Sequence, residues 1–425
     1  MPRVTRNNPR MLYVSLALLS CAMLIAAVWQ TTRRAEAAEV TRSEPLVRFA
    51  NDSAGESSIR DRDIQFYQQR VAADQQSATD RAMLGGLLFS RARSTGSSKD
   101  LDRAEAVVRE SLRLRGQRNG AAFELLASIL MSRHNFREAH DVASRADSLA
   151  PNTPSHLALL GEIELELGDY AAAAAHFTAV HFDGQQFAIG ARLARWYELT
   201  GRADVARAML QRSIAQVGKR DDLPAEQISW FDYRLGELEL RLGKFSAADS
   251  AFQRGLKRNP DDLRILSGLA RSALARGNPR AAVDYGERTI GMQLDPTVLG
   301  TLSEAWAALG DSAQSAQYTT AMSVAALTQP GAIHRAWGLH LLDHGSVAAR
   351  ADVLRRAQQD IRERRDIYGH DLLAWALHRA GRHAAAQREM RLALSHGTED
   401  VQLHAHARAI GIAPTPPLAT AVVHP

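Results

Sequence analysis

The sequence predicts an all-α protein: a helical solenoid of about nine helix–turn–helix units that follows one N-terminal transmembrane helix. Two features of the 425-residue chain predict it. A nineteen-residue segment without charge lies near the N-terminus, and a set of glycine, small and apolar positions recurs along most of the remaining chain. Recurrence at a near-constant spacing is typical of stacked helical units that bury one continuous core.

The first element is the segment 11–29, MLYVSLALLSCAMLIAAVW, which has the length of a membrane-spanning helix. At about 1.5 Å per residue it spans roughly 28 Å, close to the hydrocarbon thickness of a bilayer. Three arginines precede it, so the positive-inside rule places residues 1–10 in the cytoplasm and the rest of the chain on the exported, periplasmic side. We expect a flexible tether at 30–58, because this stretch is polar and lacks apolar periodicity.

Other readings of the N-terminal segment stay open. A cleaved signal peptide ending at Ala37 would leave a soluble exported protein, although Arg33 and Arg34 stand where cleavage regions lack positive charge. A lipoprotein signal at Cys21 is disfavoured because the eight residues after it are apolar. A reversed topology would make the chain a cytoplasmic scaffold. Cys21 is the single cysteine, so the sequence allows no intrachain disulfide and no metal site built from cysteines.

The repeat is marked by a glycine where the first helix of each unit is expected to end. Small residues stand seven positions upstream, such as Gly161 and Gly236, and alanine usually stands five positions downstream, as at Ala173 and Ala248. Small residues let two helices cross closely, and glycine accepts the left-handed backbone of a tight turn. His134 takes the glycine's place in an early unit. The glycines are 33 to 36 residues apart, except for one interval of 42: Gly168, Gly201, Gly243, Gly277, Gly310, Gly345 and Gly381.

These positions resemble those of the tetratricopeptide repeat (TPR), a helix–turn–helix unit of about 34 residues. The stretch LGELELRLGKFSAADSAFQRGLKRNP, from Leu235 to Pro260, matches the TPR pattern closely, and LGEIELELGDYAAAAAHF, from Leu160 to Phe177, repeats its frame. The resemblance implies a right-handed superhelix whose first helices line a concave, partner-binding face. The expected organisation is a helix at 59–77, the repeats at 78–400, a capping helix at 401–411 and a disordered tail at 412–425.

The TPR resemblance also implies which residues face inward. The residue after each small first-helix position forms a row that reads Ser128, Glu162, Arg195, Glu237, Arg271, Glu304, Leu339 and Trp375. Its alternating charges either bind a peptide of mixed charge or form inter-repeat salt bridges, each contributing about 0–1 kcal/mol if exposed. With neighbouring inward positions, the candidate partner-binding residues are Arg192, Arg195, Tyr233, Arg234, Glu237, Arg271, Glu304, Arg335, Tyr368, Asp371, Trp375 and His378.

The last repeat is the preferred contact site, because Tyr368, Trp375 and His378 give it more aromatic character than the middle of the array. Protein interfaces are enriched in tyrosine, tryptophan and arginine at the positions that dominate binding. The competing interpretation is that the capping helix from Val401 covers these rings.

The sequence predicts no catalytic site and no cofactor. It contains no phosphate-binding loop, no G-x-S-x-G and no HExxH motif. Ten of the fifteen histidines follow residue 325, and His340 and His344 have the i, i+4 spacing of a metal-binding pair. Without an evident third ligand, we expect polar surface histidines and no metal site. An enzyme or metal-dependent factor that uses this histidine-rich third is the alternative.

The net charge of +5 is small for 425 residues, and arginine clusters are balanced by acids and do not alternate with aromatics. We therefore expect no nucleic-acid partner and no small-molecule substrate. The leading interpretation is a non-enzymatic, membrane-tethered TPR scaffold that binds a protein or peptide partner. The layout of one span followed by repeats is similar to that of single-span periplasmic TPR proteins, and this similarity implies a role in envelope assembly or secretion.

Overall fold

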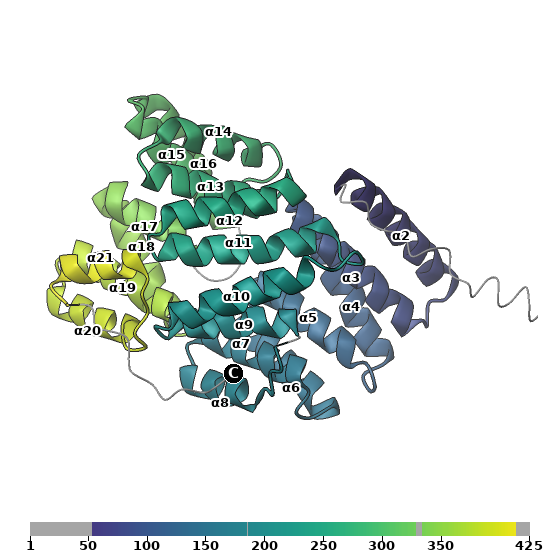
Figure 1. The fold of residues 1–425 in the computed structure, drawn as a ribbon. Helices are drawn as coiled ribbons and strands as arrows, with labels where there is room; N and C mark the ends of the chain where they lie inside the picture. The colour runs from purple at the N-terminus through teal and green to yellow at the C-terminus, as the bar shows by residue number, and fades with distance from the viewer. Residues whose placement is uncertain (1–52, 185, 329–333, 414–425) are drawn as a thin grey trace, which may run out of the picture. The chain divides into compact units, whose positions relative to one another are not determined.

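The computed structural model describes residues 53–184, 186–328 and 334–413, and these residues form helices and turns without any strand (Figure 1). The expected transmembrane segment 11–29, most of the expected tether and the tail from 414 lie outside the described residues. Among the helices that are described, none combines the length and the hydropathy that a membrane span requires.

Helix α2 (Ser53–Ala73) comes first among the described helices, and nine helix pairs and a final helix follow it. The predicted all-α solenoid is confirmed for this part of the chain, with one helix pair per expected unit. The pairs are α3 (Ala78–Thr95) and α4 (Ser98–Leu114), α5 (Gly120–Ser132) and α6 (Phe136–Leu149), α7 (Pro154–Leu167) and α8 (Tyr170–Ala179), α9 (Phe187–Leu199) and α10 (Ala203–Val217), α11 (Ala225–Arg241) and α12 (Phe245–Arg258), α13 (Leu263–Ala275) and α14 (Pro279–Ile290), α15 (Pro296–Ala308) and α16 (Ser312–Thr328), α17 (Arg335–His344) and α18 (Val347–Asp360), and α19 (Ile367–Arg379) and α20 (His383–Ala393), before α21 (Val401–Ile410).

The start of α2 corrects the expected boundary between tether and helix. The helix begins at Ser53, inside the segment expected to be flexible. Both carboxylate oxygens of Glu56 accept a hydrogen bond from the backbone N–H of Ala225, at 2.8 and 2.9 Å. Ala225 is the first residue of α11, where backbone N–H groups lack partners within the helix and favour negative charge. The first turn of α2 is therefore held by a capping contact from a distant repeat.

The two helices of each pair cross where the sequence places small residues. A Cβ atom built on Gly236 of α11 would lie 2.3 Å from the Phe252 ring of α12, and one on Gly161 would lie 2.8 Å from the Phe177 ring. Ala173 and Ala248, on the second helices, are fully buried. The small residues therefore make room for a buried ring, so the recurring sequence pattern reflects how the two helices of each pair pack.

The turn glycines adopt the left-handed backbone at every predicted position except one. Their φ angles lie between 71° and 87° at Gly168, Gly201, Gly243, Gly277, Gly310 and Gly381, and His134 has φ 57°. Gly345 is the exception, with φ −78° and ψ 167°. There the short helix α17 ends, Ser346 is extended, and its hydroxyl caps α18 by accepting from the Ala349 N–H at 3.2 Å. A serine cap replaces the left-handed turn at this one junction.

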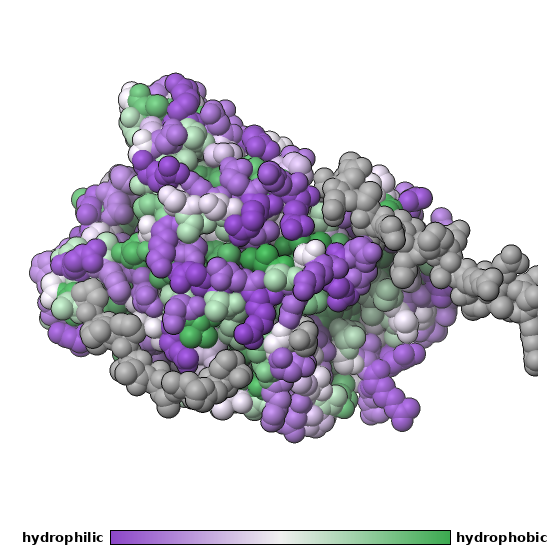
Figure 2. Space-filling model, viewed as in Figure 1, coloured by the Kyte–Doolittle hydropathy of each residue, from purple (hydrophilic) through white to green (hydrophobic). Residues whose placement is uncertain are grey.

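The first helices of consecutive pairs pack against one another along the array, from α3 through α5, α7 and so on to α19. Each first helix also packs on its own second helix, whereas second helices of consecutive pairs do not pack on one another in this way within the described residues. On the face drawn in Figure 2, hydrophilic side chains cover most of the helices and hydrophobic side chains show between them. The inner side of the array is thus built from first helices, as the TPR resemblance implies.

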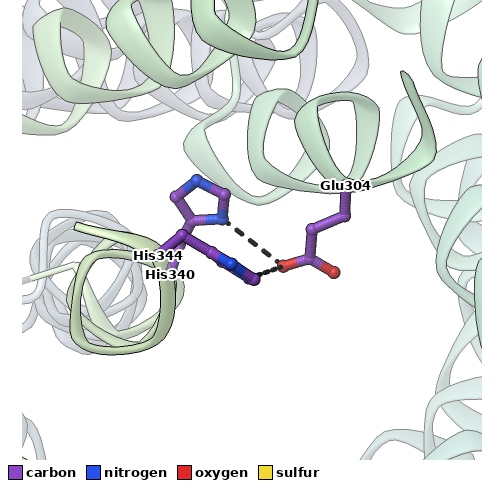
Figure 3. A group of neighbouring side chains, drawn as sticks. All are labelled: Glu304, His340 and His344. Carbon is purple, nitrogen blue, oxygen red and sulfur yellow. Dashed lines mark hydrogen bonds and ion pairs between the residues drawn. The ribbon is translucent and has the colours of Figure 1, made fainter. Parts of the chain in front are cut away.

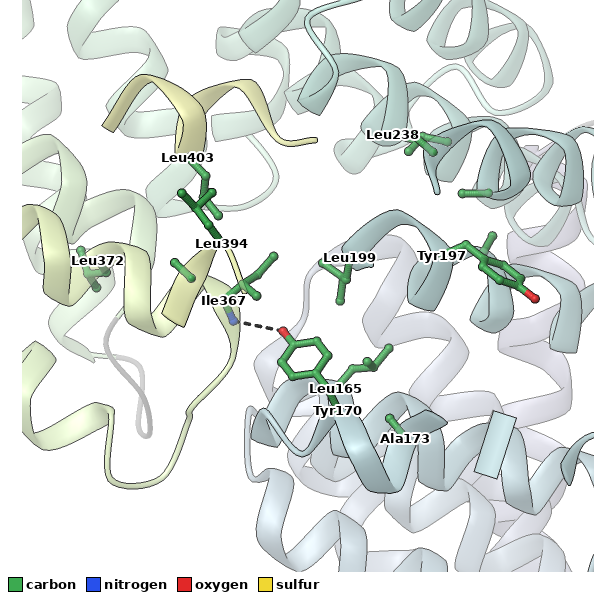
Figure 4. Close-up of a cluster of buried hydrophobic side chains, with 14 of the residues drawn as sticks. Leu165, Tyr170, Ala173, Tyr197, Leu199, Leu238, Ile367, Leu372, Leu394 and Leu403 are labelled. Atoms are coloured by element: carbon green, nitrogen blue, oxygen red, sulfur yellow. Dashed lines mark hydrogen bonds between the residues drawn. The ribbon is translucent and has the colours of Figure 1, made fainter. Parts of the chain in front are cut away.

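The last repeats return to contact the third and fourth repeats. Tyr170 of α8 accepts a hydrogen bond on its hydroxyl oxygen from the backbone N–H of Ile367, at 3.1 Å, across the cluster of buried side chains in Figure 4. The Arg365 N–H donates to the carbonyl oxygen of Leu167 at 3.1 Å. His396 stacks on the Tyr170 ring, with 4.0 Å between ring centroids. We call this set of contacts the closure contact, because it joins repeats that are about 200 residues apart.

Candidate functional site

The inner side of α9, α11 and α13 carries a cluster of arginines and glutamates. Glu198 of α9 lies at its centre, with its Oε1 atom 3.0 Å from Arg195 Nη1 and 2.6 Å from Arg241 Nη1. Burial raises the pKa of the Glu198 carboxyl, but the guanidiniums of Arg195, Arg241 and Arg234 outweigh this effect and lower the pKa to about 2. Glu198 is therefore an anion held among cations.

Ion pairs continue from this cluster along the array. Arg241 Nη2 lies 3.0 Å from Glu237 Oε2 on the same helix, and Arg271 of α13 pairs with the other oxygen of Glu237. The pairs Arg241–Glu198 and Arg271–Glu237 join neighbouring repeats, as the salt-bridge interpretation of the row expects. Glu162 of α7 also joins a neighbouring repeat, but through Arg192 of α9 at 2.8 Å and not through Arg195 of the row. The partner-binding role of these residues stays a prediction.

Arg234 lies farther from its nearest carboxylate than the other inward arginines do, and its guanidinium has no hydrogen bond within the described residues. Its nearest anionic atom is Glu198 Oε2, 3.8 Å from Nη2, and its side chain is 18% exposed. Its Nε atom is buried without a partner. Burial and the neighbouring charges of Arg195 and Arg241 lower the pKa of Arg234, although Glu198 opposes them. The guanidinium also lies 5.7 Å from the Trp230 ring, a cation–π distance.

Tyr233 lies on the same inner face of α11, but its contacts differ from those of Arg234. Burial raises its pKa, and the Arg264 guanidinium lies 5.8 Å from its ring. Tyr233 also packs against the small core cluster that contains Phe252. Tyr233 therefore contributes to packing, whereas Arg234 is the residue of α11 whose guanidinium has no hydrogen bond within the described residues.

Tyr368 of α19 lies between two of the predicted arginines. The Arg335 guanidinium is 4.9 Å and the Arg195 guanidinium 5.4 Å from the Tyr368 ring centroid. Burial raises the pKa of Tyr368 to about 12, so its hydroxyl keeps its proton and donates to Asp400 Oδ2 at 3.4 Å. Arg335 also pairs with the buried Asp371 at 2.6 Å. The structure thus brings Arg195, Arg335, Tyr368 and Asp371 together, although they lie on three different helices.

The capping helix α21 covers much of the aromatic end. The ring of His406 stacks on Trp375 at 4.5 Å between centroids, and its Nδ1 atom lies 2.7 Å from Asp371 Oδ1. His378 stacks beside Trp375 at 5.2 Å. The Trp375 Nε1–H donates to Asp343 Oδ1 at 2.9 Å. Trp375 is therefore packed between α19 and α21, as the competing interpretation describes, whereas the His378 ring contacts Trp375 and His383 of α20.

Several residues of this region were missed by the sequence analysis. Glu198 and Arg241 lie three and four residues after inward positions, and their i, i+3 and i, i+4 spacing on the same helix face was an available signal. Asp400 and His406 belong to the expected cap. No spacing in the sequence could place them, because they reach α19 only after the chain has turned at 394–400.

Glu304 lies apart from this cluster, on α15. Its Oε1 atom is 3.4 Å from His340 Nδ1 and 3.9 Å from His344 Nε2, both on α17 (Figure 3). His344 is exposed, as the sequence analysis expected of surface histidines. His340 is only 5% exposed, so that expectation is wrong for it. The residue reaches the interior because α17 packs between α15 and α19.

Comparison with known proteins agrees with this fold. A sequence model of the family Tetratricopeptide repeat matches residues 124–186 and 233–298, which fall mainly on α5–α8 and α11–α14. No curated protein sequence matches the chain.

Several solved structures are similar to the chain. The human IFIT1 dimer with m7Gppp-AAAA is 14% identical, with 77% of this chain and 72% of that chain covered and a TM-score of 0.51. PilW, a type IV pilus biogenesis factor, is 18% identical, with 49% and 94% covered and a TM-score of 0.40. A TPR protein from Thermus thermophilus is 23% identical, with 43% and 98% covered and a TM-score of 0.35.

At such identities a likeness concerns the fold alone. The helix pairs, the small residues at their crossings and the two matched ranges all agree with each other. The tetratricopeptide repeat is therefore identified in residues 124–186 and 233–298, and the other helix pairs of the described residues repeat the same helix–turn–helix architecture.

Proposed function

We propose that the chain is a non-catalytic adaptor that binds an acidic segment of a protein partner on the inner side of α9, α11 and α13. The observation that carries the proposal is Arg234. Its guanidinium is mostly enclosed, lacks a hydrogen bond and lies beside two further guanidiniums that lower its pKa. A carboxylate on a partner would supply the missing hydrogen bonds and a negative charge closer to the guanidinium than Glu198 is.

The shape of the array supports a peptide-like partner. TPR arrays bind extended segments of other proteins on the face lined by first helices. Arg192, Arg241 and Arg271 each keep between 25% and 28% side-chain exposure, so they face solvent while they pair with glutamates. An extended acidic segment could therefore meet several arginines in successive repeats. The inward polar residues serve packing and pairing, and we assign them no catalytic role, cofactor or small-molecule substrate.

The membrane tether belongs to the same proposal. Segment 11–29 would hold the array at the membrane, with the repeats exported and a role in envelope assembly or secretion. Reporter fusions placed after Arg34 and after Pro425 test this topology. Both reporters should be active only on the exported side, whereas a cytoplasmic signal from both would support the reversed topology.

The binding proposal is tested by fluorescence anisotropy with the full chain in detergent. The probe is a fluorescein-labelled peptide of ten glutamates, with a ten-residue peptide of alternating glycine and serine as the uncharged comparison. Arg234→Gln removes the guanidinium that lacks a hydrogen bond. Arg113→Gln is the matched control, because Arg113 is 68% exposed on the second helix α4 and pairs only with Glu110.

We expect the acidic peptide to bind, and Arg234→Gln to weaken it by about tenfold or more, since a hydrogen bond to a charged group contributes about 1.5–3 kcal/mol. Arg113→Gln should leave the affinity unchanged. Equal losses of affinity in Arg234→Gln and Arg113→Gln would overturn the assignment of the inner side of α9, α11 and α13 as the binding face. Tighter binding of a labelled ten-nucleotide oligoadenylate than of the acidic peptide would replace the protein partner with a nucleic acid.

A further inference from the structure

Glu304, His340 and His344 bring one carboxylate and two imidazoles together in a part of the array that the proposed function does not use. Their candidate ligand atoms all lie within 4.8 Å of one another. The two histidines are one helical turn apart on α17, so they share a face, and Glu304 reaches them from the neighbouring repeat. In Figure 3 both rings lie on the side of α17 that faces Glu304.

A chain of hydroxyl groups determines which ring nitrogen of His340 carries a proton. Ser303 Oγ lies 3.0 Å from the Ser315 carbonyl oxygen, 3.1 Å from the Ser315 hydroxyl and 2.8 Å from Thr319 Oγ1. The carbonyl oxygen can only accept, so Ser303 donates its single hydrogen there and accepts from both hydroxyls. Thr319 has then used its own hydrogen, so its oxygen accepts from His340 Nε2, 3.1 Å away. Only this arrangement satisfies all four contacts, and it puts a proton on Nε2.

The remaining nitrogen of His340 then faces an acceptor. In a neutral imidazole with a proton on Nε2, the Nδ1 atom carries a lone pair, and it lies 3.4 Å from Glu304 Oε1. A positive charge resolves this contact in one of two ways: a second proton makes His340 an imidazolium that donates to Glu304, or a metal ion is bound by both atoms. Hydrogen bonding of the outer ring nitrogen is also how proteins orient histidines that bind metals. Thr319 therefore has the position and role of a residue that supports a metal ligand.

The distances are close to those of a tetrahedral site. With metal–ligand bonds of about 2.1 Å, neighbouring ligand atoms in such a site are about 3.4 Å apart. The pair of Glu304 Oε1 and His340 Nδ1 already has this separation. The separation between Glu304 Oε1 and His344 Nε2 is 3.9 Å, and the His344 side chain is 57% exposed, so a small rotation can shorten it.

The three groups also line a cavity of about 750 Å³ between α15, α16 and α17. Ser312, Ser315 and Thr320 add hydroxyl groups to its wall. A fourth coordination position on a bound ion would therefore open into a polar space, where water or a donor group of a partner can enter. Metal sites with three protein ligands and one open position have this layout.

We infer that Glu304 Oε1, His340 Nδ1 and His344 Nε2 bind a divalent transition-metal ion of the zinc class, with one open position facing the cavity. Two imidazoles and one carboxylate suit zinc and its neighbours, whereas magnesium and calcium take oxygen ligands. The inference is independent of the acidic-peptide proposal, because Arg234 lies on α11 and all three ligands lie on α15 and α17.

The test uses the full chain in detergent, without any histidine tag and stripped of metal with a chelator. Calorimetric titration with zinc measures the stoichiometry, and cobalt in its place gives visible absorption bands whose intensity reports four-coordination. The ligand variants are His344→Ala and Glu304→Gln. Both side chains are at least 45% exposed, so their replacement should leave the fold intact, and a thermal unfolding curve checks this. His383→Ala is the control, because His383 is also exposed and lies outside the cluster.

We expect one zinc ion per chain, at least tenfold weaker binding for each ligand variant, and unchanged binding for His383→Ala. Thr319→Val should weaken binding by about 10- to 100-fold, because it removes the acceptor that orients His340. Binding well below one ion per chain would overturn the inference, as would equal affinity in wild type and His344→Ala. Cobalt spectra typical of six-coordination would also count against the proposed ligand set.

Discussion

Gly236 and Phe252 face each other across the helix pair α11–α12, and a Cβ atom added to the glycine would stand 2.3 Å from the ring atom Cε1. The same relationship recurs between Gly161 and Phe177, where the distance is 2.8 Å. Real Cβ atoms do not approach a ring so closely, so either the ring or the helix must move when the glycine is replaced. The crossing glycine is thus a steric requirement of the repeat.

Gly236→Ala should destabilise the protein by about 1–3 kcal/mol, the usual cost of an overpacked core. Gly161→Ala should cost less, since its Cβ has more room. Gly120→Ala is the control, because Gly120 begins α5 and nothing lies within 4 Å of its Cβ position. That variant should be neutral or stabilising by up to about 1 kcal/mol, since alanine favours a helix more than glycine does. Chemical unfolding of the three variants measures the order, and equal stability of all three would contradict the packing argument.

The closure contact is tested by a second pair of glycines. Gly168 and Gly310 have φ angles of 82° and 87°, so alanine costs each about 1–2 kcal/mol from backbone strain. A Cβ on Gly168 would also lie 2.2 Å from the backbone carbon of Arg365, whereas nothing lies within 4 Å of one on Gly310. Gly168→Ala should therefore be less stable than Gly310→Ala by about 1–3 kcal/mol. Matching losses would show that the last repeats do not pack on α7.

The stability of the closure contact should depend on pH through His396. Burial lowers the pKa of this ring, which stacks on Tyr170. The unfolded chain therefore binds a proton near its ordinary pKa of about 6.5, before the folded chain does. The stabilising contribution is complete above that pH and is lost as the pH falls below it. His396→Phe keeps an aromatic ring for stacking but removes the titrating group. Between pH 7.5 and pH 5 the free energy of unfolding should therefore decline less steeply in this variant than in wild type. Equal slopes in the two proteins would refute this prediction.

Glu198 is expected to be the most sensitive carboxylate of the inner face. Glu198→Gln should cost about 3 kcal/mol, because it leaves buried guanidiniums without their counter-charge. Because its pKa is lowered to about 2, the contribution of Glu198 is present above about pH 4.5 and is lost as the pH falls towards 2. Glu363→Gln is the control, since the Arg137–Glu363 pair is 63% exposed on both sides and contributes about 0–1 kcal/mol. Denaturant midpoints at pH 7 compare the two, and a larger loss for the control would count against the network.

The sequence was sufficient to predict the elements that repeat. Every helix pair needs the same close crossing and the same tight turn, so the glycine pattern recurs from repeat to repeat, as at Gly161, Gly168, Gly236 and Gly243. A single sequence therefore contains enough copies of the pattern to recognise it. Gly345 shows the limit of this reasoning, because the glycine is present while the turn is built on a serine cap.

The sequence was insufficient where contacts join repeats that are distant along the chain. Whether Tyr170 meets Ile367 depends on small rotations between repeats that add up over the array, and even the contact of Glu304 with His340 in the neighbouring repeat depends on one such rotation. Local patterns do not encode these rotations. The inward row could therefore be named in advance, but the partners of Tyr368, Trp375 and His340 could not.

The most direct test of the central claim is photo-crosslinking of the full chain in its native cells. A photoreactive amino acid replaces Glu162 on the inner face, where the side chain is 27% exposed, or Arg113 on the outer helix α4. The account predicts a protein adduct from position 162 that disappears in Arg234→Gln and is displaced by the ten-glutamate peptide, with none from position 113. An adduct from position 113 alone, or one from position 162 that survives Arg234→Gln and the peptide, would contradict binding on the arginine-rich inner face.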